Sequence, residues 1–156
     1  MQPSRFDEVA FFRALDQSGA RALLIGRRAL VLLGLPVLTA DYDFWIAIDD
    51  IEPFNVVAAR FDLRPTRTPD QARQHGRYVL ENDEHVDVLV ARSVPTFKGE
   101  SVQFDELWKE RVRVPLDDVH VSMPSLDNLI LTKQIRSRPK DLEDIRLLRI
   151  LKESRS

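Results

Sequence analysis

The chain has 156 residues, of which 44% are hydrophobic and 31% are charged, and these values are typical of one globular domain rather than of a disordered or fibrous chain. Its formal net charge of −2 provides no overall attraction to nucleic acid, and its lack of cysteine excludes disulfides and thiolate metal sites. Residues 1–20 carry charges unlike a signal peptide, and no apolar run is long enough to span a bilayer, so we expect a cytoplasmic protein with no membrane partner.

The first part of the chain is predicted to form a helix followed by a strand, a turn and a second helix. Residues 4–18 have apolar side chains at helical spacing, which predicts an amphipathic helix. Residues 21–25 are short and apolar enough for a buried strand and lead directly into Gly26. Residues 29–33 are expected to be helical until Gly34 ends them. Gly26 therefore lies at the junction between a strand and a helix.

The middle of the chain is predicted to contain a strand, a helix and a β-hairpin. Residues 41–48 are expected to form the strand, and acidic residues just before position 51 favour a helix at 51–61. Residues 65–74 are interpreted as a polar connection. Residues 77–81 and 84–91 form two extended runs joined by a short polar turn, which predicts a hairpin.

The last third of the chain is predicted to end in two helices. The elements expected there are a loop at 93–101, a helix at 104–109, strands at 111–114 and 119–122, and helices at 125–137 and 139–152. All these elements together predict an α/β (α+β) fold, in which a mixed, mostly antiparallel sheet carries helices on one face. We expect one domain over residues 1–156, with an α/β core at 1–122 and a two-helix extension at 123–156.

Three aspartates are the strongest functional signal. Because strand side chains alternate between faces, Asp41 and Asp43 share a face, and the valines beside Asp87 point away from its carboxylate. If the two strands are neighbours, the three carboxylates converge, and oxygen ligands of this kind suit Mg²⁺, which offsets their repulsion. The alternative is that these aspartates lie at strand edges and face water. Their apolar neighbours disfavour this alternative, because carboxylates are seldom buried without a partner or a metal.

Gly26, Lys133 and Trp45 are further candidate site residues, and each also has a purely structural interpretation. A glycine that starts a helix lets a phosphate approach backbone N–H groups, although turn glycines are commoner. Lys133 lies on the apolar stripe of the predicted 125–137 helix, where it either binds phosphate or packs its stem on the core. Trp45 shares the strand face of the first two aspartates and either borders a base pocket or belongs to the core.

The histidines do not have the spacing of a zinc site. His75, His85 and His120 are expected to be structural or exposed, and His85 shares the strand face of Asp87. The sequence contains no glycine-rich dinucleotide motif, P-loop or serine nucleophile elbow. The enzyme classes that depend on those motifs are therefore poor candidates.

The glycine and the aspartates belong to motifs that follow one another in a defined order. These motifs are Leu23-Leu24-Ile25-Gly26, Asp41-Tyr42-Asp43-Phe44 and Val86-Asp87-Val88. Further motifs are Gly34, Pro36 and Thr39, and then Pro124-Ser125-Leu126, Lys133 and Arg138-Pro139-Lys140-Asp141-Leu142. Their order and spacing resemble the nucleotidyltransferase superfamily with a polymerase-β-like fold, in particular its small bacterial members and abortive-infection toxins. The resemblance covers most of the chain.

This resemblance implies a metal-dependent enzyme that moves a nucleoside monophosphate from a nucleoside triphosphate (NTP) to a hydroxyl group. In such an enzyme Asp41, Asp43 and Asp87 would be catalytic and would bind Mg²⁺, with Mn²⁺ as an alternative. The residues expected to bind the nucleotide are Gly26, Arg27, Thr39 and Lys133. The resemblance leaves the acceptor open between tRNA, a protein and a small molecule, and it includes toxins that act with an antitoxin partner.

Two positions depart from the pattern of the superfamily. Arg27 stands where a second small residue is usual, and Val37 stands where an arginine is common. Arg27 either crowds the phosphates or donates its guanidinium to them, since arginine forms bidentate contacts with phosphate oxygens. The alternative is a degenerate site in a protein that keeps the fold as a nucleotide-binding or protein-interaction module. The retained aspartates argue against this alternative, because three repelling carboxylates serve no purpose without a metal.

Overall fold

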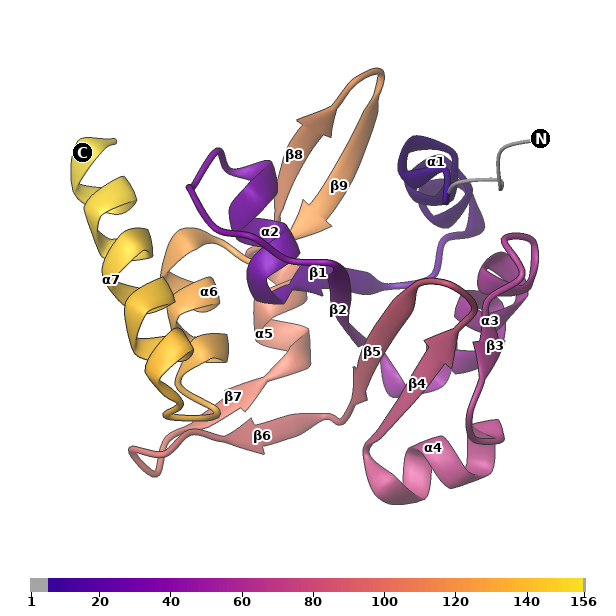
Figure 1. Cartoon of the computed structure of the whole chain (residues 1–156). Coiled ribbons are helices and arrows are strands. Elements are labelled where there is room, and N and C mark those ends of the chain that lie inside the picture. The colour runs from indigo at the N-terminus through magenta and orange to yellow at the C-terminus, as the bar shows by residue number, and fades with distance from the viewer. Residues whose placement is uncertain (1–5, 156) are drawn as a thin grey trace.

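The computed structural model describes residues 6–155, which form a central sheet with helices around it (Figure 1). The helices are α1 (Glu8–Ser18), α2 (Gly26–Leu32), η1 (Ile48–Asp50, a 3₁₀ turn), α3 (Ile51–Ala59), α4 (Pro69–His75), α5 (Phe104–Lys109), α6 (Leu126–Lys133) and α7 (Pro139–Ser154). The strands are β1 (Ala22–Ile25), β2 (Asp41–Ile46), β3 (Arg64–Pro65), β4 (Arg77–Glu81), β5 (His85–Val90), β6 (Ser93–Pro95), β7 (Ser101–Gln103), β8 (Val112–Leu116) and β9 (Val119–Met123). Within these described residues, no helix is long and apolar enough to cross a membrane.

The central sheet has five strands in the order β1-β2-β5-β4-β3. Strands β2 and β5 run parallel, whereas the β1–β2, β5–β4 and β4–β3 pairs are antiparallel. The β6–β7 and β8–β9 pairs form two separate antiparallel ribbons. The predicted mixed, mostly antiparallel sheet is confirmed, and its central parallel pair brings together two strands that are far apart in the sequence.

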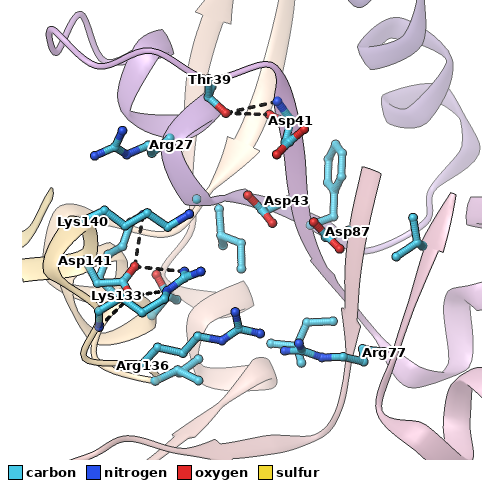
Figure 2. A pocket seen from close by; sticks show the side chains of 18 of the residues that line it. Arg27, Thr39, Asp41, Asp43, Arg77, Asp87, Lys133, Arg136, Lys140 and Asp141 are labelled. Carbon is cyan, nitrogen blue, oxygen red and sulfur yellow. Dashed lines mark hydrogen bonds and ion pairs between the residues drawn. The ribbon is translucent and has the colours of Figure 1, made fainter. Parts of the chain in front are cut away.

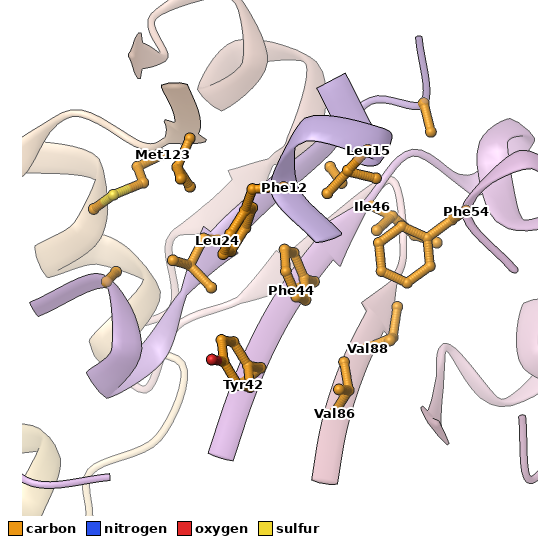
Figure 3. Packing of buried hydrophobic residues seen from close by; sticks show 14 of the residues in the cluster. Phe12, Leu15, Leu24, Tyr42, Phe44, Ile46, Phe54, Val86, Val88 and Met123 are labelled. Carbon is orange, nitrogen blue, oxygen red and sulfur yellow. The ribbon is translucent and has the colours of Figure 1, made fainter. Parts of the chain in front are cut away.

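The main hydrophobic core lies on one face of this sheet, where α1 and α3 cover it (Figure 3). Because strand side chains alternate, β2 directs Tyr42, Phe44 and Ile46 to this face. Phe12 from α1 and Phe54 from α3 pack on Phe44, with ring centroids 5.9 and 5.4 Å away. The same alternation directs the acidic residues of β2 to the other face.

A smaller apolar cluster covers part of that other face. Leu23 and Trp45 are completely buried there against Phe104 and Leu107 of α5. The indole N–H of Trp45 donates a hydrogen bond to the carbonyl oxygen of Ala91 at 2.9 Å. Trp45 is therefore a core residue, which decides between the two roles that the sequence left open for it.

Two segments predicted to be irregular contain secondary structure, so both predictions were wrong. Residues 65–74 include the end of β3 and most of α4. That helix begins with a capping box, in which the Thr68 hydroxyl accepts the Gln71 amide and the Gln71 side chain accepts the Thr68 amide, followed by Pro69 in the first turn. Residues 93–101 include β6 and the start of β7, which pair as a hairpin.

Several helices and strands differ from their predicted limits. The first helix begins at Glu8, because the Asp7 carboxylate caps it by accepting the Ala10 amide at 3.0 Å; positions 4 and 5 of the predicted helix lie outside the described residues. The helices predicted at 51–61 and 125–137 end earlier, at the last residues of α3 and α6. The strand predicted at 41–48 ends before η1.

The chain closes with the two predicted helices. Helix α6 begins after Ser125, whose hydroxyl accepts the Asn128 amide at 3.3 Å, and α7 has Pro139 in its first turn. The two helices pack on each other, and α7 also contacts α2 (Figure 1). The predicted fold class with its C-terminal extension is confirmed, while the division at residues 122 and 123 stays a prediction.

Candidate active site

The parallel pairing of β2 with β5 sets two aspartates side by side. Asp43 is the register partner of Asp87, and Asp41 is the partner of His85. Neighbouring strand residues in register point to the same face, so the three carboxylates lie on the face opposite the main core. Figure 2 shows Asp43 and Asp87 next to each other on adjacent strands, with Asp41 further along β2.

A cavity of about 700 Å³ opens over this face. Its walls come from the β1–α2 turn, from β2, β4 and β5, from the segment before α4 and from α6 and α7. The predicted site residues that line it are Gly26, Arg27, Thr39, Asp41, Asp43, Asp87 and Lys133. The fold thus brings all seven into one cavity, and the roles assigned to them stay predictions.

The environment of Asp43 disfavours its charged form. Burial is the main cause that raises the pKa of its carboxyl group above the usual 3.8, and the charges of Asp87 and Asp41 raise it further. The cationic groups of Lys133 and Lys140 act in the opposite direction without cancelling the effect. A positive charge bound beside Asp43 would stabilise the ionised form of its carboxyl group.

The donor atoms of the cavity suit a hard divalent cation, but they are not gathered around one point. Among residues 6–155, no group of three acidic or histidine side chains is arranged closely enough to hold an ion. Asp41 lies two residues, about 7 Å, further along β2 than Asp43, and Asp87 Oδ2 lies 3.1 Å from Nε2 of His85. Repulsion between like charges favours this spacing. The chemistry of three carboxylates in one cavity, with the raised pKa of Asp43, nevertheless fits Mg²⁺ or Mn²⁺.

Gly26 is required by two features of the structure. Its φ of +71° lies in the left-handed region that favours glycine. A Cβ atom at this position would lie 2.3 Å from Asp43 Oδ2 and 2.9 Å from Asp43 Cβ. The absence of a side chain therefore lets the β1–α2 turn lie directly against the Asp43 carboxylate.

Replacing Gly26 with alanine is expected to destabilise the fold by about 1–3 kcal/mol and to displace Asp43, because the new methyl group adds both backbone strain and a clash. The matched control is Gly34→Ala, since Gly34 has a similar φ of +85° but open space where its Cβ would lie. Urea unfolding together with Mg²⁺-dependent NTP binding checks this. Equal losses of NTP binding in the two variants would contradict a specific role for the contact with Asp43.

Lys133 and Arg27 both bind the carboxylate of Asp144, a residue of α7 that was not among the predicted site residues. Asp144 is completely buried, and its Oδ2 accepts hydrogen bonds from Lys133 Nζ at 2.7 Å and from Arg27 Nε at 3.2 Å. Its Oδ1 is buried without a hydrogen-bond partner among the described residues. Lys133 is itself 7% exposed and lies 3.9 Å from a second carboxylate, that of Asp141. Asp144 thus joins α2, α6 and α7 at one wall of the cavity.

Thr39 acts on the backbone at the start of β2. Its hydroxyl accepts the Asp41 amide at 3.1 Å and lies 3.4 Å from the Asp41 carbonyl oxygen (Figure 2). Val37, at the other position that departs from the superfamily, packs against the main core. Thr39 therefore fixes where Asp41 enters the cavity, while Val37 supplies no charge there.

Several basic residues of the cavity were missed or only partly recognised in the sequence. The segment before α4 contributes Arg67 and β4 contributes Arg77, both within stretches interpreted only as a connection and a hairpin. Arg136, Arg138 and Lys140 follow α6, and from the sequence they were interpreted only as a solvated or substrate-facing basic edge. With Lys133 and Arg27, these side chains surround the aspartates with positive charge. A polyanion such as a triphosphate suits this surrounding.

A model of a known protein family matches most of the chain. Residues 12–154 match the model of the family described as nucleotidyltransferase of unknown function (DUF6036). The chain belongs to this family. No curated protein matches its sequence.

Several solved structures have the same fold as this chain. The Thermotoga maritima nucleotidyltransferase TM1012 is 16% identical, with a TM-score of 0.61 over 92% of this chain and 89% of that one. The lincosamide antibiotic adenylyltransferase LnuA, solved with lincomycin bound, is 14% identical, with a TM-score of 0.61 over 94% and 98%. ANT(2″)-Ia in complex with adenylyl-2″-tobramycin is 14% identical, with a TM-score of 0.58 over 90% and 84%. At these identities the likeness establishes the fold alone.

Proposed function

We propose that this chain transfers a nucleoside monophosphate from an NTP to a hydroxyl group of an acceptor. The observation that carries the proposal is the Asp43–Asp87 pair, which lies side by side in a cavity whose other walls are basic. The cavity volume of about 700 Å³ is that of a small-molecule site. Membership of a nucleotidyltransferase family supports the same reaction.

Asp41, Asp43 and Asp87 are the proposed ligands of Mg²⁺, with Mn²⁺ as the alternative. When bound, such an ion supplies Lewis acidity to the phosphoryl group and orients it. The high pKa of Asp43 supports its part in this set, because a carboxylate that is costly to ionise gains most from a nearby cation.

Gly26, Arg27, Thr39 and Lys133 are the proposed nucleotide-binding residues. Gly26 lets the backbone of the β1–α2 turn lie directly against the Asp43 carboxylate, so a nucleotide bound at Asp43 would meet that backbone. Lys133 and Arg27 form the basic wall on that side and are oriented by Asp144. Thr39 holds the backbone from which Asp41 projects. These contacts would bind the triphosphate of the NTP and stabilise the charge of the departing pyrophosphate.

Asp87 is the proposed base for the acceptor. A carboxylate oxygen of Asp87 takes the proton of the acceptor hydroxyl. At the same time the acceptor oxygen forms a bond to the α-phosphorus of the NTP, and the bond between that phosphorus and the leaving pyrophosphate breaks. His85 Nε2, 3.1 Å from Asp87 Oδ2, holds this carboxylate in place. Of the histidines, His85 is the one whose strand parity pointed to the site.

Calorimetric titration with ATP, CTP, GTP and UTP in the presence of Mg²⁺ tests the proposal. We expect metal-dependent binding of at least one NTP to the native protein and a loss of this binding in Asp41→Ala/Asp43→Ala, because the doubly substituted cavity lacks two of its three carboxylates. The absence of metal-dependent binding at millimolar NTP would refute the proposal.

One observation favours the second candidate function, a non-catalytic nucleotide-binding or protein-interaction module. Asp144 binds both Arg27 and Lys133, and it thereby competes with phosphate for the two cations that the superfamily pattern assigns to the nucleotide. Incubation with NTPs labelled at the α-phosphate and with total cellular RNA and protein separates the two functions. Label transfer that Asp87→Ala abolishes excludes the module, whereas NTP binding without transfer supports it. A toxic effect and an antitoxin partner stay predictions from the resemblance.

A further inference from the structure

Three arginines of the cavity, Arg67, Arg77 and Arg136, come from the segment before α4, from β4 and from the segment after α6. Arg77 is the register partner of Leu89, two residues beyond Asp87 on β5, so its side chain projects from the same face of the sheet. Figure 2 shows Arg77 and Arg136 extending toward one another from opposite walls of the cavity. Arg67 lines the same cavity, and its Nη1 donates to the carbonyl oxygen of Arg77 at 2.5 Å.

These arginines differ from Arg27, Lys133 and Arg138 in having no acidic partner, a property that they share with Lys140 among the described residues of the cavity. Arg27 and Lys133 bind Asp144, and Arg138 binds Asp141. In the part of the chain that the structure describes, Arg67, Arg77 and Arg136 form no ion pair. Two of them nevertheless approach each other across the cavity. Like charges in such an arrangement are stabilised by an anion between them.

The chemistry of arginine indicates which kind of anion these side chains would bind. A guanidinium presents paired N–H donors in one plane and binds phosphate oxygens in a bidentate manner. Arginines from two walls can hold one phosphate group from two directions. A phosphate is therefore the ligand that this part of the cavity fits best.

The position of the arginines decides which substrate carries this phosphate. The proposed triphosphate site lies at Gly26 and Asp43, where Lys140 is close enough for its charge to act on Asp43. Arg77 lies on the far side of Asp87, the proposed base, and so on the side from which an acceptor hydroxyl must approach. We infer that Arg67, Arg77 and Arg136 form an anion subsite for the acceptor, which carries a phosphate near its reacting hydroxyl. This inference rests on the proposed function.

The subsite also discriminates against cations. Tobramycin, which appears in the complex of the ANT(2″)-Ia neighbour, has amino groups that are protonated at neutral pH. Such an acceptor would be repelled by three uncompensated guanidinium groups. The acceptor of this chain therefore belongs to a different chemical class, that of a phosphorylated hydroxyl compound. Its source is either the 3′ end of a polynucleotide or a small phosphorylated molecule.

Calorimetry with four probes tests the subsite: ribose 5-phosphate, ribose, a single-stranded RNA tetranucleotide with a 3′ hydroxyl, and tobramycin. The titrations use the native protein with and without the α,β-methylene analogue of its best-bound NTP. We expect ribose 5-phosphate or the RNA to bind and ribose and tobramycin not to bind. We expect Arg77→Glu to weaken binding of the phosphorylated probe about tenfold or more, through loss of a charge-assisted contact.

The control variant is Arg149→Glu, because Arg149 is exposed on α7 and lies outside the cavity. It changes the net charge equally and is expected to leave probe binding unchanged. Tighter binding of the RNA indicates a polynucleotide acceptor, and tighter binding of ribose 5-phosphate indicates a small one. The inference is wrong if neither phosphorylated probe binds, if tobramycin binds more tightly than both, or if Arg77→Glu and Arg149→Glu behave alike. NTP binding is measured separately in each variant, so its absence would count against the proposed function instead.

Discussion

Replacing Asp43 with asparagine is expected to abolish nucleotide transfer and, at the same time, to stabilise the folded protein at neutral pH. Loss of this proposed metal ligand should remove several kcal/mol of transition-state stabilisation, which corresponds to a rate decrease of about a thousandfold or more. The gain in stability has a separate cause. Asparagine has nearly the same shape as aspartate but does not carry the charge that burial and Asp87 disfavour.

The pH dependence of this gain follows from the raised pKa of Asp43. The folded state binds the Asp43 proton more readily than the unfolded state, whose pKa is near the usual 3.8. The contribution of Asp43 to the free energy of unfolding is therefore most favourable in acid, and it is lost as the pH rises from the unfolded pKa through the higher folded pKa. The asparagine variant has no such loss. Its advantage over the native protein should be absent in acid and should grow as the pH rises through the folded pKa of Asp43.

Thermal unfolding at several pH values, with and without Mg²⁺, measures this advantage. Mg²⁺ should raise the melting temperature of the native protein and leave that of the asparagine variant nearly unchanged, since we propose that the ion binds the carboxylates of the folded native protein. Asp83→Asn is the matched control, because Asp83 is exposed in the β4–β5 turn. A variant at position 43 that melts below the native protein at pH 7, or that keeps full transfer activity, would contradict the electrostatic explanation.

The acidic part of the site could be predicted from local sequence because its geometry is local. Strand parity alone places Asp41 and Asp43 on one face and Asp87 on the matching face of another strand. The sequence did not provide the spacing of the carboxylates, which depends on the β2–β5 register and on the contact of Asp87 with His85. For this reason the expected common cluster is looser in the structure than the sequence suggested.

The basic part of the site was harder to predict, because its residues lie in short elements. Helix α4 has seven residues, of which Ala72 is buried, so it has almost no hydrophobic periodicity. The Thr68–Gln71 capping box was its available signal, and that signal was overlooked. The adjoining Arg67 was therefore placed in a polar connection rather than at a cavity wall.

Asp144 could not have been recognised from its neighbours in the sequence. An acidic residue near the start of a helix usually interacts favourably with the helix dipole, so its position alone does not indicate a buried ion pair. Its observed partner Arg27 is 117 positions away, and the contact depends on how α7 packs on α2 and α6. Tertiary packing of this kind leaves no periodic pattern in the sequence.

Replacing Asp144 with alanine is expected to destabilise the protein by about 3 kcal/mol, because it leaves the buried ammonium of Lys133 without its closest partner. Lys133 is 7% exposed, so water cannot fully replace the lost contact. The Asp141 carboxylate, 3.9 Å from Lys133 Nζ, offsets part of the loss. This places the expected effect at the lower end of the range for broken buried ion pairs.

The double variant Lys133→Met/Asp144→Leu separates folding from function. Replacing a whole buried ion pair with apolar side chains of similar size is often neutral or stabilising, so the double variant should recover most of the stability lost in Asp144→Ala. It should not recover NTP binding, because the ammonium that we propose for the triphosphate is gone and Arg27 is no longer oriented. Urea unfolding and calorimetric NTP titration measure the two properties independently.

Arg146→Ala is the control for Asp144→Ala, since Arg146 pairs with Glu143 on the exposed side of the same helix. Exposed pairs contribute little, so this variant should unfold almost as the native protein does. If Asp144→Ala behaves like the control, the buried pair does not hold α7 in place. If the double variant binds NTP as well as the native protein, Lys133 is a structural residue, and the basic wall of the nucleotide site must come from the cations after α6.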